Sequence, residues 1–300
     1  MFRHLLIPLD GSSLAEAVLP AVSFLAGKCG SLVTLLHVIE SDTPGTVHGE
    51  KHLRSFAEAE AYLKDLAGRG LLQGITVDWH VHEQVTANVA RSLAAHTEEF
   101  EPDLVVMCAH GQDRLRNMLF GNIAQQTFKT SRIPLLLLQP CSGTGCLPFR
   151  QILLPLDGLK EHEQGLPLAA FLAGICSASL QLLMVIPTPG SLPGEKSAVG
   201  SLLPGTTRAI LDLEEERAVG YLQDHAQRFE QQGLHVRAKV TRGDPVEQIA
   251  ETVAAISADL VVLGTHGKSG THAFWSASVA SKLISRINVS FLLVPASPLP

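Results

Sequence analysis

The segment from Asp259 to Ser278 carries the residues whose types and spacing point most clearly to chemistry. Gly264 and Gly267 are separated by two residues, and Ala277-Ser278 follows nine residues later. Glycines let a backbone adopt positive φ and approach an anion, while successive N–H groups and a helix N-terminus supply partial positive charge. Ser278 can cap the next helix and donate its hydroxyl to a phosphate. The spacing predicts a phosphate-binding loop, in which the Cβ of Ala277 opposes positive φ by about 1 kcal/mol.

An earlier segment, from Asp103 to Asn122, repeats this pattern. Cys108 and Gly111 have the same spacing, and Gly121-Asn122 follows nine residues later. Asn122 keeps the ability to cap a helix. Cys108, however, replaces a glycine where the strand leaves the sheet, which opposes close approach of a phosphate or ribose. We therefore expect at least one anion site to survive and favour the one in the second segment.

The whole chain consists of two copies of one unit. FRHLLIPLDG at 2–11 matches FRQILLPLDG at 149–158 with seven identities in ten. The offset between copies is 147 there (149 minus 2) and 156 at the later DLVV motifs (259 minus 103), so the second copy contains insertions. A repeat of this length indicates tandem domains. We expect domains at 1–140 and 149–300, joined by a linker at 141–148.

Within each copy, short apolar runs alternate with segments of helical period, which is typical of a parallel sheet covered by helices on both faces. In the first copy we expect strands at 3–9, 32–39, 75–82, 103–109 and 134–139, and helices at 14–28, 51–69, 86–98 and 122–131. In the second we expect strands at 150–156, 179–186, 234–241, 259–265 and 290–294, and helices at 162–174, 208–232, 245–256 and 278–286. Asp244, Pro245 and Glu247 predict a capping box. The segments 41–51 and 187–207 are predicted to be mobile loops able to cover a site, although simple insertions are commoner.

The first strand of each copy ends in a Pro-x-Asp element. Pro8-Leu9-Asp10 and Pro155-Leu156-Asp157 stand at matching positions. A carboxylate at the C-terminal end of a strand, over the crevice of an open sheet, can accept a hydrogen bond from a ribose or a base. It can also cap the following helix. We place the ligand-facing role slightly ahead, and both roles can hold together.

Taken together, these features resemble the universal stress protein family over essentially the whole chain. The Pro-x-Asp elements, a valine after each second strand (Val38 and Val185) and the G-x2-G-x9-G-[S/T] loops carry the resemblance, although neither loop matches completely. The resemblance implies two Rossmann-like (adenine nucleotide alpha hydrolase-like) α/β domains. Each would be a five-stranded parallel sheet with helices on both faces. The apolar last strands, 134–139 and 290–295, would pair in an intramolecular pseudo-dimer.

The resemblance also implies a ligand, namely ATP or a related adenine nucleotide, with or without Mg²⁺. The protein would act as a nucleotide-dependent stress-response or regulatory module with unidentified protein partners. A homodimer of the whole chain is compatible with this resemblance. The residues that the resemblance places at the nucleotide are Pro155, Asp157, Val185, Leu263, Gly264, His266, Gly267, Ala277, Ser278, Val279, Pro8, Asp10, Val38, Met107, Gly111, Gly121, Asn122 and Ile123. No residue is assigned a catalytic or metal-binding role.

Two other readings stay open. Cys108 and Ala277 could have abolished nucleotide binding and left an interaction module of the same fold, or the chain could be an ATPase or transferase that shares the fold. The sequence contains no GxxxxGK[ST], GxSxG or HExxH motif, so any ATP hydrolysis should be slow. His110 and His266, at matching loop positions, more simply hold loop geometry than bind phosphate. A metal site from His48, His52, His80 and His82 is conceivable, but no cysteine or carboxylate converges with them in the sequence.

Bulk composition narrows the partners and the compartment. A formal charge of −6 and a pI near 6.1 argue against nucleic acid or an anionic membrane as the main partner. Five cysteines, few and odd in number, fit a reducing compartment, and Cys141 and Cys146 are more simply free linker thiols than a redox pair. The uncharged stretch 165–186 is long enough to cross a bilayer, but Pro167 and the polar CSAS turn favour a buried helix followed by a buried strand. We expect a cytoplasmic protein.

Overall fold

The structure of the chain is a computed structural model that describes residues 1–41, 46–47, 49–86, 88–109, 124, 127, 133–140, 148–192, 202–266 and 277–296. It divides into two compact units. The first unit contains Met1–Pro148 together with Ser290–Pro295, and the second contains Phe149–Val289 and the residues after Pro295. The first unit therefore takes in most of the last strand of the second repeat.

The first unit is built on a sheet whose first five strands are parallel, as predicted. They are β1 (His4–Pro8), β2 (Leu32–Glu40), β5 (Thr76–Thr86), β6 (Leu104–Cys108) and β7 (Leu135–Leu138), in the spatial order β5-β2-β1-β6-β7. The strand β12 (Ser290–Ala296) pairs antiparallel with β7, with Leu292 opposite Leu136. The two apolar last strands of the repeats thus pair, and neither leaves this edge exposed.

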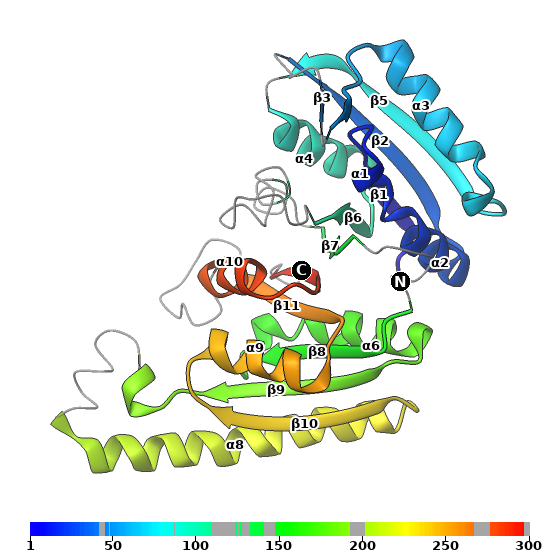
Figure 1. Ribbon diagram of the computed structural model, residues 1–300. Helices are drawn as coiled ribbons and strands as arrows, with labels where there is room; N and C mark the ends of the chain where they lie inside the picture. Colours follow the sequence, from blue (N-terminus) through cyan, green and yellow to red (C-terminus); the bar gives the residue numbers. More distant parts are fainter. Residues whose placement is uncertain are drawn as a thin grey trace. The chain divides into compact units, whose positions relative to one another are not determined.

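The helices of the first unit cover both faces of this sheet. They are α1 (Ser13–Glu16), α2 (Leu19–Cys29), α3 (Phe56–Gly68) and α4 (Val89–Phe100), with the short η1 turn (Gly70–Leu72) and a two-stranded hairpin of β3 (Thr46–Val47) and β4 (Glu50–Lys51). The crossovers β1 to β2 and β2 to β5 run in one direction, whereas β5 to β6 runs back, so right-handed connections place α2 and α3 opposite α4. Figure 1 shows α3 running alongside β5.

The second unit repeats this plan with a four-stranded parallel sheet. Its strands are β8 (Gln151–Leu156), β9 (Ser179–Ile186), β10 (His235–Arg242) and β11 (Leu260–His266), in the order β10-β9-β8-β11. Its helical elements are η2 (Lys160–His162), α6 (Gly165–Cys176), η3 (Pro189–Ser191), α8 (Pro204–Glu230), α9 (Pro245–Ile256) and α10 (Ala277–Arg286). The long helix α8 packs along β10 and β9 (Figure 1).

Several predicted helix boundaries are wrong, each for a local reason. The helix expected at 14–28 is broken into α1 and α2, because Pro20 must stand in the first turn of a helix. The helix expected at 51–69 begins only at Phe56, after Ser55 has capped it by accepting the Glu58 N–H at 3.3 Å. The helix expected at 86–98 starts at Val89, because Thr86 still belongs to β5 and Asn88 supplies the cap.

The remaining predictions about helices and loops have mixed outcomes. The stretch 165–186 is the buried helix α6 followed by β9, as predicted, and no helix among the described residues is long and apolar enough to cross a membrane. Asp244 caps α9 by accepting the Glu247 N–H at 3.1 Å, while the Glu247 carboxylate lies 4.0 Å from Arg286. The loop predicted at 187–207 is shorter, since α8 begins at Pro204. Most of the helix predicted at 122–131, and the linker from 141 to 147, lie outside the described residues.

Candidate functional site

Each unit has a point where the order of its parallel strands reverses. In the second unit, β8 has β9 on one side and the returning strand β11 on the other. Open α/β sheets bind ligands at such a point, in the crevice outside the carboxyl ends of the strands. Asp157 follows β8 directly, and Gly264 lies near the end of β11. In the first unit β1 and β6 have the same relation, so Asp10 and Cys108 hold the matching places.

In the second unit the carboxylate at this point is held by two donors. The Leu159 backbone N–H donates to Asp157 Oδ1 at 3.0 Å, and the ring Nδ1 of His162 is hydrogen-bonded to Asp157 Oδ2. The side chains of His162 and Asp157 are only 4% and 8% exposed. With the Asp157 carboxylate as the acceptor, the imidazole Nδ1–H is the donor of this hydrogen bond. Asp157 is thus fixed within the turn that follows β8, and it does not cap α6, whose N-cap is Gln164.

The same turn packs directly against Gly264. A Cβ at this position would lie 2.7 Å from the main-chain carbonyl oxygen of His162, closer than real Cβ contacts allow. The glycine in the predicted loop therefore has a structural reason that its sequence pattern does not reveal. His162 joins the two sides of the crevice, with its ring on Asp157 and its carbonyl on Gly264.

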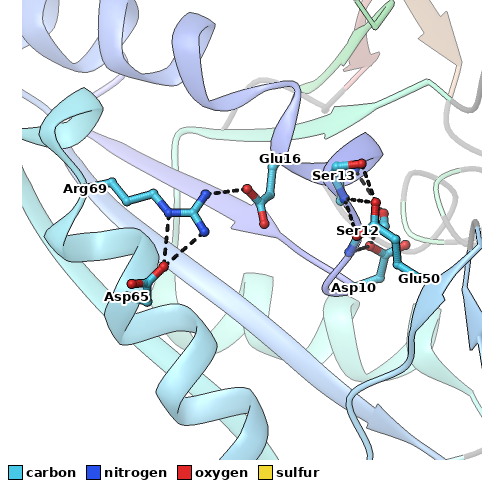
Figure 2. A network of polar contacts seen from close by, with 8 residues as sticks. Asp10, Ser12, Ser13, Glu16, Glu50, Asp65 and Arg69 are labelled. Atoms are coloured by element: carbon cyan, nitrogen blue, oxygen red, sulfur yellow. Dashed lines mark hydrogen bonds and ion pairs between the residues drawn. The ribbon is translucent and has the colours of Figure 1, made fainter.

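In the first unit the matching carboxylate has a different partner. Asp10 Oδ1 accepts hydrogen bonds from the Ser12 N–H at 2.9 Å and from the Ser12 hydroxyl at 2.6 Å. Ser12 in turn caps α1 by accepting the Ala15 N–H at 3.2 Å. Asp10 therefore supports a helix cap through Ser12, as Figure 2 shows. Asp10 itself does not cap α1, because the N-cap residue is Ser12.

The segment 50–54 of the first unit contacts the turn that follows β1, and we call it the strap. The Glu50 carboxylate accepts the Ser13 N–H at 3.1 Å and the Ser13 hydroxyl (Figure 2). A Cβ on Gly11, whose φ is +92°, would lie 3.0 Å from the Leu53 side chain. His52 Nε2 lies 4.0 Å from Glu40 at the end of β2. The strap thus contacts the chain just after β1 and the end of β2.

The corresponding segment of the second unit is attached elsewhere. Ser191, in η3, donates its hydroxyl to the carbonyl of Gly243 at 3.2 Å, after the end of β10. Within the described residues, the space beside Gly158 is approached by Met184 of β9 and by no residue of 187–192. The described parts of the two loops after the second strands therefore have different anchor points.

Cys108 is buried at the end of β6 in the first unit. Burial, together with the nearby Asp10 carboxylate, raises the pKa of its thiol to about 11. His37 is 1% exposed and its Nδ1 donates to the Leu9 carbonyl at 2.7 Å; burial lowers the pKa of this imidazole. Cys108 is therefore a neutral thiol at physiological pH, where the second unit has a glycine.

Comparison with known proteins gives a consistent result. The model of the universal stress protein family matches residues 1–139 and 148–295. The chain belongs to the universal stress protein family. A universal stress protein of Synechocystis is 28% identical over 155 residues, covering 51% of this chain and 90% of that protein. The universal stress protein E homolog of Haemophilus influenzae is 24% identical over 236 residues, covering 74% of this chain and 71% of that protein.

A solved structure supports the fold over the full length. A universal stress protein from Archaeoglobus fulgidus matches with a TM-score of 0.63 at 17% identity, covering 98% of this chain and 96% of that chain. A likeness at this identity concerns the fold alone. Together with the two family matches, it makes this chain a tandem universal stress protein of α/β architecture.

The residues that the family resemblance places at the nucleotide are only partly described. The strands β1, β2, β6, β8, β9 and β11 contain, respectively, Pro8, Val38, Met107, Pro155, Val185 and Leu263, and Val279 is buried in the first turn of α10. His266 ends β11, and Ala277 and Ser278 begin α10. Gly111, Gly121, Asn122, Ile123 and Gly267 lie outside the described residues, as does His110. The structure brings Asp157 and Gly264 together through His162, and it places Asp10 near Cys108.

The histidines weighed as metal ligands make a different kind of cluster. His82 Nδ1 lies 3.0 Å from His96 Nε2, and His96 Nδ1 lies 2.7 Å from a Glu99 carboxylate oxygen. The ring of His80 contacts His96 edge to face, with centroids 4.7 Å apart. Across the part of the chain that the structure describes, no three His, Cys, Asp or Glu side chains are arranged to hold a metal ion. His48 lies outside that part.

Sequence reasoning missed His162 and the strap. One signal could have found His162: at the offset of 147 it aligns with Ala15, so a histidine replaces an alanine one turn after the aspartate. The strap had a weaker signal, because it lies in a segment predicted partly as loop and partly as the beginning of a helix. Both depend on contacts between segments that are distant in the sequence.

Proposed function

We propose that this universal stress protein binds ATP or a related adenine nucleotide, with or without Mg²⁺, in the crevice of the second unit. Occupancy of the crevice would then tune its contacts with other proteins in a cytoplasmic stress response. The observation that carries the proposal is the position of Asp157 and Gly264 on the two sides of the switch point of the sheet, with His162 in contact with both. A fixed carboxylate and a loop leading into a helix N-terminus are complementary to a sugar hydroxyl and a phosphate, respectively.

Each part of the proposed site has a chemical role. A carboxylate offers about four lone-pair sites. The Leu159 N–H and the His162 ring use one on each Asp157 oxygen, so hydrogen bonds to a ribose remain open to it. Val185, buried at the end of β9, would contact the adenine. The loop after β11 and the first turn of α10, which Ser278 joins, would hold the phosphates. No group in this arrangement is assigned to catalysis.

The first test is whether purified protein carries a nucleotide. Mass spectrometry of small molecules released from gently prepared full-length chain should detect ATP, ADP or another adenine nucleotide. Calorimetry should then show Mg-ATP binding that Gly267→Val weakens at least about tenfold, because side-chain bulk enters where backbone N–H groups meet phosphate. The matched variant Gly111→Val, at the same step of the first loop, should change the affinity much less. Equal affinity in all three proteins would exclude the second loop from the site.

A second candidate function is a protein-interaction module that binds no nucleotide. The first unit favours it, because Cys108 puts a buried thiol at the loop position and the strap contacts Gly11 and Ser13. The absence of released nucleotide together with no heat on titration of Mg-ATP would favour this function for the whole chain. Multiple-turnover hydrolysis abolished by Asp157→Ala would instead indicate an enzyme.

A further inference from the structure

His162 touches both sides of the second unit's crevice. Its ring bonds Asp157 after β8, and its main-chain carbonyl lies against Gly264 of β11. The imidazole is 4% exposed, so few water molecules compete for this bond. A hydrogen bond to a charged group is strong in such surroundings, and a buried carboxylate that loses a donor is destabilised.

The turn that carries His162 is anchored at several points. The His162 N–H donates to the Leu159 carbonyl at 2.9 Å, closing the η2 turn. At the next residue, the Tyr221 hydroxyl of α8 donates to the Glu163 carboxylate at 3.0 Å, which ties the turn to the long helix. The imidazole is therefore held in one place by its own backbone and by its neighbour, and it can impose an orientation on Asp157.

The first unit shows what the same place looks like without this histidine. Ala15 occupies the matching position and has no side-chain donor, and Asp10 bonds Ser12 only two residues away. That carboxylate is held by its own local turn. In the second unit the donor comes from His162, five residues after Asp157, at the far end of the turn.

We propose that His162 is a positioning residue for nucleotide binding, which fixes the Asp157 carboxylate in the orientation that receives the nucleotide. The inference rests on the proposed function and adds to it a residue that acts through Asp157 and not by direct contact with phosphate. Removing the imidazole leaves Asp157 free to rotate toward other donors, so the affinity for nucleotide falls although the phosphate loop is intact.

A double-mutant cycle on Mg-ATP affinity tests this relation in the full-length chain. His162→Leu, which keeps the bulk of the side chain and removes its donor, should weaken binding about tenfold or more, and Asp157→Ala at least as much. If His162 acts through Asp157, the double variant should bind no more weakly than Asp157→Ala alone. His162→Asn keeps an N–H near the position of Nδ1 and should bind within about threefold of wild type, since it can still donate to Asp157.

The controls separate positioning from a general loss of structure. His225→Leu removes another partly buried imidazole of this unit, one that lies 3.8 Å from Glu163 and not at Asp157, and it should leave the affinity unchanged. Additive losses in the cycle, wild-type affinity in His162→Leu, or failure of His162→Asn to restore binding would each overturn the inference. A wild-type chain that binds no Mg-ATP would overturn the proposed function and the inference with it, an outcome distinct from a failed cycle.

Discussion

The two units use one duplicated plan, yet they fill the switch point of the sheet in opposite ways. In the second unit a glycine, Gly264, leaves room for the His162 carbonyl, and the histidine ring holds Asp157. In the first unit Cys108 brings a side chain to that position, and Asp10 is bound by Ser12 within its own turn. The bulkier side chain at the switch point thus lies on a strand in the first unit and in the turn after another strand in the second unit.

This difference teaches that matching positions of the two units carry different chemistry. The second unit presents a fixed carboxylate beside a glycine, and the first presents a neutral, buried thiol. After a domain is duplicated, one copy is enough to bind the ligand. The first copy can therefore keep the fold and lose the site. This comparison is the reason why the proposed nucleotide site lies in the second unit.

The strongest way to break this comparison is to give the second unit a side chain where the first already has one. In Gly264→Ala the new Cβ meets the His162 carbonyl at 2.7 Å, and neither is the end of a flexible side chain. We expect a loss of about 3 kcal/mol in the free energy of unfolding of the second unit, the upper end of the usual cost of overpacking. Cys108→Ala, which shortens the matching residue, should cost about 1 kcal/mol.

Urea unfolding of the full chain, followed by hydrogen exchange in peptides from each unit, measures both effects separately. A Gly264→Ala protein as stable as wild type would show that the turn at His162 moves without cost. The account of why glycine stands there would then be wrong.

A second difference concerns acid. Burial lowers the pKa of His96, and the neighbouring His80 and His82 lower it further, although the Glu99 carboxylate opposes them. Burial also lowers the pKa of His37 in the same unit. A histidine whose pKa is lower in the folded state leaves more protons on the unfolded chain. Its contribution to stability is therefore complete above the ordinary value of about 6.5 and is lost as the pH falls through the folded value.

The first unit should accordingly lose stability as the pH falls below about 6.5, and His96→Phe should flatten this slope. Phenylalanine preserves the stacking on Phe100, whose ring is parallel within 7° of His96, but it cannot take up a proton. In the second unit the pKa of His225 is also lowered. Because the described part of this unit has one such histidine where the first unit has two, its stability should depend less on pH, and His96→Phe should not change that dependence. A slope that His96→Phe leaves unchanged would assign the acid sensitivity to other groups.

A third variant sharpens the comparison at the strap. Glu50→Ala removes the acceptor of the Ser13 N–H, and we expect the amides of residues 11–15 and 50–54 to exchange about tenfold faster, since one charge-assisted hydrogen bond is lost. Glu60→Ala is the matched control, because Glu60 is exposed on α3 and belongs to the same unit. Equal exchange in the two variants would mean that Glu50 does not hold the strap in place.

The smallest expected effect comes from a matched pair of helix ends. Gly30 ends α2 with φ of +65°, whereas Ser177 at the same place ends α6 with φ of +54°. The left-handed conformation strains a serine and does not strain a glycine. Ser177→Gly should therefore stabilise the second unit by about 1 kcal/mol or slightly less, and Gly30→Ser should destabilise the first unit by a similar amount. Denaturant midpoints of both variants measure the pair, and equal signs would contradict it.

Much of the fold follows from the sequence because its strands are strongly patterned. The apolar runs at Leu104–Cys108 and Ser179–Ile186 are buried on both faces of a parallel sheet. The ends of such runs in the sequence therefore indicate where the strands end. Helix starts were less predictable. Pro20, Ser55 and Asn88 fix three of them through local geometry that competes with a continuing helical pattern.

The candidate site was predictable only as a set of positions. The duplicated Pro-x-Asp element located Asp157 at the end of β8, but the bond from His162 and the contact of its carbonyl with Gly264 depend on how a turn folds back across two strands. Spacing alone explains Gly264 as an approach point for an anion. The tertiary contact supplies a second reason for the same residue, which periodicity and motif cannot distinguish from the first.

The most direct test of the assignment is a crystal of the full-length chain soaked in millimolar Mg-ATP. The account predicts nucleotide density in the second unit, with a ligand hydroxyl within hydrogen-bonding distance of the Asp157 carboxylate. It predicts no nucleotide density in the crevice of the first unit. An empty second crevice, or nucleotide bound only beside Asp10 and Cys108, would contradict it.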